Sequence, residues 1–134
     1  MNEEPRFIVD TMLGTVARWL RILGYDTVYD RNAEDWQIIR RAELEKRIVI
    51  TRDRGLHNKA IKIGLRSILL WEDETSDRLA RIALLTGIKL IIDFTRTRCP
   101  EDNALLVKTT KEKIKDKVPP GVYKVHNDFW ECPR

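Results

Sequence analysis

Apolar residues along the chain follow two alternating patterns, and each pattern predicts a different element. Short, almost unbroken apolar runs predict buried strands, whereas apolar residues three and four positions apart predict helices with one buried face. In segment 12–23, for example, Leu13, Val16 and Leu20 share such a face, and a helix-ending glycine, Gly24, follows. The predicted strands are residues 6–10, 27–29, 47–51, 67–71 and 89–94, and the predicted helices are residues 12–23, 34–46, 58–63 and 76–86.

Strands alternate with single helices over the first part of the chain. This order is typical of βαβ units, which join parallel strands by right-handed crossovers. The strands are apolar on both faces, as expected when helices cover both sides of a sheet. The sequence therefore predicts an α/β fold, a three-layer α/β/α sandwich with a mainly parallel sheet. We place this domain at residues 1–96 and expect residues 97–134 to form a small C-terminal tail packed on it.

Length and composition exclude several classes of protein. The chain has 134 residues, enough for one hydrophobic core, and 43% of them are hydrophobic, which excludes a disordered or collagen-like chain. No uncharged apolar run reaches the roughly 18 residues of a membrane span, and the first residues include acids where a secretory signal is basic. We therefore expect a cytoplasmic protein, and the 34% of charged residues point to a thermophile.

The positive charge of the chain is concentrated in one segment. The net charge is only +4, but segment 40–66 contains nine basic residues against three acidic ones. Such a patch suits a polyanion, so nucleic acid is a candidate partner, with an ordinary solvated surface as the alternative.

Acidic residues follow two of the predicted strands and open one predicted helix. Asp10 follows the first strand and Asp53 the third, while Asp35 lies in the first turn of the second helix on its core-facing side. Sites in open parallel sheets form at the carboxyl ends of the strands, so these three carboxylates are expected to converge there. A single aspartate in such a place is more often a helix cap or turn residue, and we interpret Asp73 and Asp93 in that way.

A cluster of three carboxylates is unstable without a cation, because the negative charges repel one another. Hard oxygen ligands favour Mg²⁺ or Mn²⁺ over zinc, and such a centre activates water to hydrolyse a phosphodiester. Basic side chains near the expected centre would hold phosphate groups. The candidate phosphate-binding residues are Arg18, Arg21, Arg52, Arg54 and Lys59.

Three segments of the chain carry a family resemblance, namely FIVDTMLGTVARWLRILGYDTVYD, EDWQII and RIVITRDRGL. In these segments the sequence resembles the PIN-like ribonuclease family named for the C-terminal domain of the Mut-seven exonucleases. The resemblance implies an α/β/α sandwich whose acids bind a divalent metal and hydrolyse RNA. It matches Asp10, Asp35 and Asp53 to the family's acids, and Arg52 and Arg54 to the basic residues around the last acid. The fourth acid of many PIN nucleases has no clear equivalent, so the number of metal ions stays open.

Members of this family usually end in a zinc ribbon with two C-x-x-C knuckles, and this sequence departs from that pattern. Asp102 stands where the partner of Cys99 would be, and the only other cysteine is Cys132. A Cys₄ zinc site is therefore not expected. If a ribbon-like tail is kept, the resemblance places the two cysteines on facing knuckles, as a disulfide or as two buried thiols. A zinc site completed by Asp102 and His126 is the remaining alternative.

The sequence thus predicts an endoribonuclease that uses Mg²⁺ or Mn²⁺ rather than zinc for its reaction and acts on RNA in processing or turnover. The alternative is a non-catalytic RNA- or ribosome-associated binding protein with the same fold, which the altered ribbon favours. A toxin-like nuclease with a protein partner is a third hypothesis. His57 is interpreted as a cap rather than a catalytic group. Most of the tryptophans, Trp19, Trp36, Trp71 and Trp130, are expected in the core or anchoring the tail, although aromatic rings also stack on bases.

Overall fold

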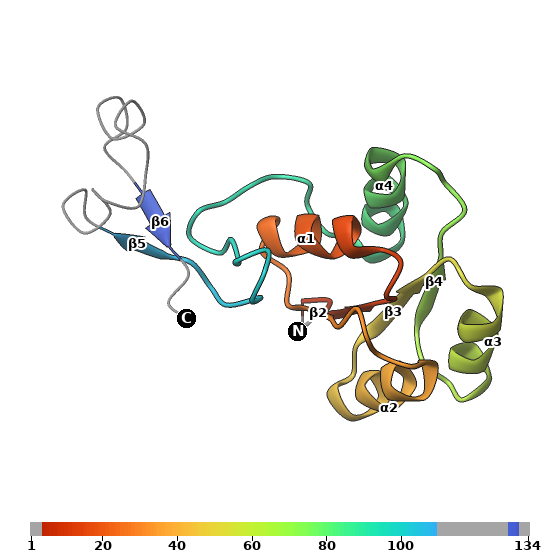
Figure 1. Ribbon diagram of the computed structural model, residues 1–134. Helices are drawn as coiled ribbons and strands as arrows, with labels where there is room; N and C mark the ends of the chain where they lie inside the picture. Colours follow the sequence, from red (N-terminus) through yellow and green to blue (C-terminus); the bar gives the residue numbers. More distant parts are fainter. Residues whose placement is uncertain (1–3, 110–128, 132–134) are drawn as a thin grey trace.

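The computed structural model describes residues 4–109 and 129–131, and its centre is a parallel sheet between two layers of helices (Figure 1). The sheet has the strand order β2-β1-β3-β4, with every neighbouring pair parallel. Its strands are β1 (Phe7–Val9), β2 (Thr27–Tyr29), β3 (Ile48–Thr51) and β4 (Ser67–Leu69). The helices are α1 (Gly14–Ile22), α2 (Asp35–Glu45), α3 (Arg54–Lys62) and α4 (Thr75–Thr86).

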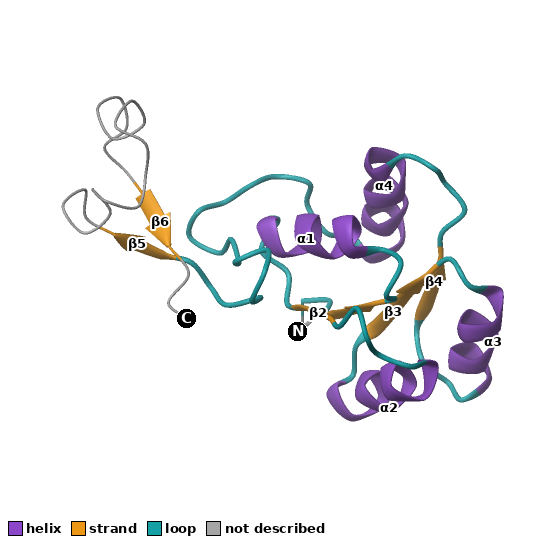
Figure 2. Cartoon of the chain, viewed as in Figure 1, coloured by secondary structure: helices purple, strands orange, loops and turns teal. Residues whose placement is uncertain are grey.

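Helices α1 and α4 cover one face of the sheet, and α2 and α3 cover the other (Figure 2). Alternate residues of a strand point to opposite faces, and β1 shows this directly. Phe7 packs in the core beneath α1 and α4, while Ile8 packs in the second core with Ile38 of α2 and Leu56 of α3. The predicted three-layer α/β/α sandwich is confirmed.

The predicted fifth strand, residues 89–94, is wrong. The backbone N–H of Lys89 donates to the Tyr25 hydroxyl over 2.9 Å, which draws this segment toward the end of α1. Asp93 then starts a turn, because its carboxylate accepts hydrogen bonds from the backbone N–H and the hydroxyl of Thr95. The turn residue expected at Asp93 is thus confirmed. The apolar residues between them, among them Ile91, remain exposed instead of pairing with the sheet.

Residues after 96 attach to the sandwich through hydrogen bonds to its backbone. The N–H of Arg98 donates to the Arg21 carbonyl over 2.8 Å, and the Asn103 side chain accepts from the N–H of Thr27 over 2.9 Å. Farther along, β5 (Val107–Thr109) pairs antiparallel with β6 (Phe129–Glu131), as in a ribbon-like tail.

Cys99 is buried in this tail. Cys132 and His126 lie outside the described residues, so the disulfide, two-thiol and zinc alternatives stay predictions. The division of the chain at residue 96 also stays a prediction. In the part of the chain that the structure describes, no helix has the length and apolar character needed to cross a membrane.

Candidate active site

Asp10 and Asp53 lie at the carboxyl ends of the neighbouring strands β1 and β3, and one hydroxyl group connects them. The Thr51 hydroxyl donates to Asp10 Oδ2 over 2.7 Å and accepts a hydrogen bond from the backbone N–H of Asp53 over 2.9 Å. Asp10 is only 6% exposed, and its Oδ1 accepts from the N–H of Thr11. The structure therefore brings two of the three predicted acids together and holds the buried one in a fixed orientation.

Asp53 has a structural role as well as a place at this edge. It is the N-cap of α3, and its Oδ1 accepts from the backbone N–H of Gly55 over 2.7 Å. The helix-cap interpretation is thus confirmed. The residue is nevertheless exposed, and a carboxylate has further lone pairs beyond the one used by the cap. Asp53 can therefore contact a ligand while it caps the helix.

Asp35 is not part of this hydrogen-bonded group. It is half-buried in the first turn of α2, directly after the N-cap Glu34. Because α2 follows β2 in the chain, its first turn lies at the carboxyl edge of the sheet, as expected. Over residues 4–109 and 129–131, no group of three or more His, Cys, Asp or Glu side chains lies close enough together to hold a metal ion. The structure thus shows a linked acid pair with Asp35 on the same edge.

Sequence reasoning missed Thr51, whose only signal is its position between an apolar run and Asp53. Replacing Thr51 with valine keeps the shape but leaves the buried Asp10 carboxylate without this donor and the Asp53 N–H without this acceptor. We expect the free energy of unfolding to fall by about 2 kcal/mol, measured by urea denaturation. Thr51→Ser keeps the hydroxyl and should lose less, and equal losses in the two variants would contradict this role.

Three of the predicted phosphate-binding residues flank Asp53 in the sequence or lie on the helix that it caps. Arg52 is half-buried and pairs with Asp73 of the loop after β4 over 3.4 Å. Arg54 and Lys59 are exposed on α3, the helix that Asp53 caps. The exposed Asp53 therefore has an arginine directly before it and another directly after it in the sequence, and a lysine follows on α3.

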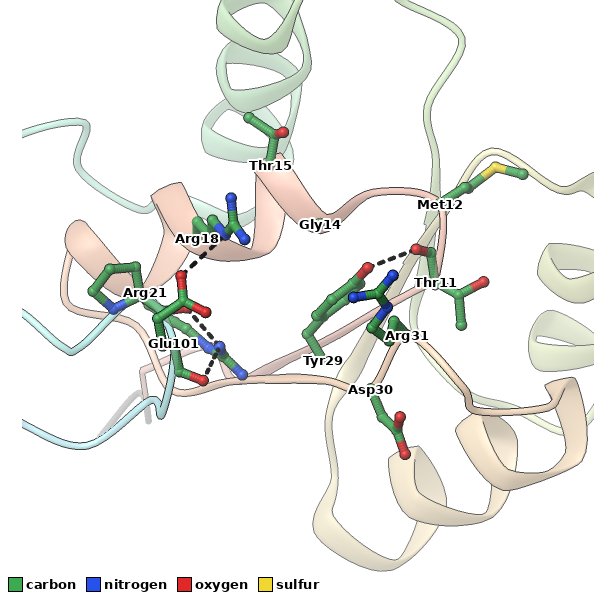
Figure 3. Close-up of a pocket in the computed structure, with 11 residues that line it drawn as sticks. Thr11, Met12, Gly14, Thr15, Arg18, Arg21, Tyr29, Asp30, Arg31 and Glu101 are labelled. Atoms are coloured by element: carbon green, nitrogen blue, oxygen red, sulfur yellow. Dashed lines mark hydrogen bonds and ion pairs between the residues drawn. The ribbon is translucent and has the colours of Figure 1, made fainter. Parts of the chain in front are cut away.

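A hollow of about 730 Å³ opens between the segments that follow β1 and β2, and its lining includes Thr11, the residue after Asp10 (Figure 3). The Tyr29 hydroxyl donates to the Thr11 carbonyl over 2.7 Å and joins these two segments. Arg18 also lines the hollow and forms an exposed ion pair with Glu101 over 3.4 Å. The hollow is thus polar, and Arg18 is the predicted phosphate-binding residue that is exposed in it.

Arg21 serves a different purpose from the expected phosphate contact. It is 6% exposed, and its guanidinium donates to the carbonyls of Thr27, Pro100 and Glu101 over 2.9, 2.7 and 3.2 Å. Burial lowers the pKa of Arg21, although nearby acidic groups oppose that change. Because these donors are directed at backbone carbonyls, Arg21 ties the tail to α1 and β2. We therefore leave it out of the proposed RNA-binding residues.

Comparison with known proteins agrees with the resemblance seen in the sequence. The chain has no match among the curated proteins or the solved structures. One family model, described as the Mut7-C RNAse domain, matches residues 5–134, which is nearly the whole chain. The sandwich with paired acids at the carboxyl edge of its sheet therefore belongs to the Mut7-C RNAse domain family, and the chain is an RNase-type nuclease domain.

Proposed function

We propose that this protein is a metal-dependent endoribonuclease whose reaction centre is built on Asp10 and Asp53. Membership of an RNase domain family supports RNA as the substrate. The observation that carries the proposal is the Thr51 hydroxyl, which donates to the Asp10 carboxylate and accepts from the backbone N–H of Asp53. The buried Asp10 carboxylate is thereby fixed at the edge of the sheet where the exposed Asp53 begins α3.

The donor set suits Mg²⁺ or Mn²⁺ better than zinc. Asp10 and Asp53 supply carboxylate oxygens at one edge, Asp35 stands at the same edge, and Mg²⁺ commonly binds through one or two carboxylates while keeping several waters. When bound, such a cation would activate a water molecule and neutralise charge on the phosphodiester. Asp10 and Asp53 would hold it, with Asp35 contributing through its waters.

The basic side chains would then position the RNA backbone. Arg52 and Arg54 flank Asp53 in the sequence, Lys59 follows on α3, and Arg18 lines the hollow that begins at Thr11. An arginine can bind a phosphate through two parallel N–H donors, which fixes direction as well as distance. In this proposal RNA runs along the carboxyl edge of the sheet, and the protein acts in RNA processing or turnover in the cytoplasm.

A calorimetric titration with Mn²⁺ tests the centre directly. The wild-type protein should bind Mn²⁺ with a measurable heat, and Asp10→Asn should lose that heat because the oriented carboxylate is gone. Glu43→Gln removes an exposed acid from the last part of α2, at the opposite edge of the sheet, and should bind like the wild type. Unchanged binding by Asp10→Asn would place the metal elsewhere. Binding of RNA without any Mn²⁺ heat or cleavage would favour a non-catalytic RNA-binding protein.

A further inference from the structure

We propose that Trp36 and Trp71 stack on bases of single-stranded RNA and hold the strand across the carboxyl edge of the sheet, one on each side of Asp10 and Asp53. This inference rests on the proposed function and names its substrate class and two contacts. Most of the tryptophans were expected in the core or anchoring the tail, yet Trp36 is 60% exposed and Trp71 is 63% exposed.

The strand order places the two indoles on either side of the acids. Reading across the sheet as β2-β1-β3-β4, the segments that leave its carboxyl edge carry in turn Trp36, Asp10, Asp53 and Trp71. Neighbouring strands are about 4.8 Å apart, so the two outer strands are separated by roughly 14 Å. A strand of RNA that contacted both indoles would therefore pass over the acid pair.

Trp71 is held in one orientation by charged groups. The Arg81 guanidinium lies 3.3 Å from the centre of the indole ring and covers one of its faces. Arg81 is fixed in turn by an ion pair with Glu72. Since the residue is still 63% exposed, its accessible surface is the opposite face and the ring edges. A base stacked there would complete a layer of guanidinium, indole and base, a contact that cation–π attraction strengthens.

Trp36 is oriented in a similar way by the start of its helix. Its indole N–H donates to Glu34 Oε2 over 2.7 Å. Glu34 is the N-cap of α2 and forms a capping box with Gln37. The polar edge of the indole is thus fixed while the ring faces remain available. An oriented ring loses little entropy when a base stacks on it, and entropy loss is a main cost of binding.

The surface between the two indoles favours RNA over a protein partner or a second copy of the chain. An interface with a protein partner would need a continuous apolar patch. The segment that leaves β3, which lies between the segments carrying the two indoles, instead contains the charged residues Arg52, Asp53 and Arg54. Cationic groups that follow the backbone, combined with aromatic rings that stack on bases, are typical of proteins that bind single strands.

Binding is measured in EDTA with the Asp53→Asn protein as background, so the result does not depend on cleavage. A fluorescent single-stranded RNA is titrated and followed by anisotropy. Adding Trp71→Ala or Trp36→Ala should weaken binding about tenfold each, since stacking contributes about 1–3 kcal/mol per base. Trp71→Phe should recover part of the affinity. Trp19→Ala, which removes an indole 41% exposed on α1, should bind like the background protein.

An abasic strand of the same length distinguishes stacking from phosphate contact. The background protein should bind it about as weakly as the double variant Trp36→Ala/Trp71→Ala binds normal RNA. That double variant should lose nothing further on the abasic strand, whereas each single variant should still lose the contribution of its remaining indole. The slope of affinity against salt should stay the same in all variants, because the phosphate contacts are kept. Equal affinity of the background protein for normal and abasic strands would overturn the proposal, as would normal RNA binding by both tryptophan variants. A change of oligomeric state in those variants would also overturn it, in favour of an interface between copies. If the tryptophan variants lose affinity for RNA but the wild-type protein cleaves no RNA, the stacking proposal stands and the proposed nuclease activity does not.

Discussion

Replacing Asp53 with asparagine should abolish RNA cleavage while the protein stays folded. Asparagine is as good a helix cap as aspartate, so the hydrogen bond from the Gly55 N–H to this side chain is kept. The substitution removes the negative charge that, in our proposal, binds the cation jointly with Asp10. Loss of an outer-shell partner already costs metal sites about 10–100-fold, so loss of a ligand should cost on the order of a hundredfold or more.

The measurement is the initial rate of cleavage of a labelled single-stranded RNA in Mn²⁺, with thermal unfolding as the test of the fold. Asp77→Asn is the matched control, because it removes the same charge from the first turn of α4, where Asp77 is exposed. This control should cleave like the wild type. Cleavage by Asp53→Asn at the rate of the control would show that the reaction centre lies elsewhere. Absence of cleavage by wild type under all metal conditions would remove the proposed activity.

The sequence predicts the sandwich and the edge at which the acids lie, because both depend on strong local patterns. Apolar runs such as residues 47–51 leave little choice but a buried strand, and an aspartate that follows such a run must emerge at the carboxyl edge. The pairing of Asp10 with Asp53 follows once β1 and β3 are neighbours. The hydrogen bonds of Thr51 could not be predicted in this way. A threonine at the end of a strand can bind many partners, and the pairing register of β1 with β3 determines which one it reaches.

Predictions failed where a residue's environment is made by a distant part of the chain. Arg21 looks like a free cation on a helix, but it is buried, and its Nη1 donates to the carbonyls of Pro100 and Glu101. The apolar run 89–94 looks like a strand, yet the backbone N–H of its first residue, Lys89, donates to the Tyr25 hydroxyl instead of to a strand of the sheet. Trp71 follows an apolar strand, and nothing local indicates that the chain turns outward after the buried Leu70. These outcomes depend on the tertiary structure, which local pattern does not encode.

Loss of the buried Arg47 side chain should destabilise the fold strongly. Its side chain is 7% exposed and forms ion pairs with Asp26 over 2.8 Å and with Glu45 over 2.6 Å. It also donates to the carbonyl of Phe7 over 3.1 Å, so it joins the start of β1 to the end of α2 and the segment before β2. Arg47→Met would leave partly buried carboxylates and a carbonyl without their donor. We expect a loss of about 3 kcal/mol, measured by urea denaturation at neutral pH.

The dependence of this loss on pH identifies its cause. Burial alone would raise the pKa of Asp26, but hydrogen bonds from Arg47 and Asn103 outweigh it and lower that pKa below its ordinary value. A carboxyl group with a lowered pKa in the folded state stabilises the protein above its unfolded pKa of about 3.9, and this contribution is lost as the pH falls through the folded pKa. The wild type should therefore lose more stability than Arg47→Met below about pH 4, and the difference between their free energies of unfolding should narrow.

The control variant is Arg41→Met, which breaks a half-exposed pair with Glu45 and should cost less than about 1 kcal/mol. A constant difference from neutral to acidic pH would show that Arg47 acts through packing rather than through its ion pairs.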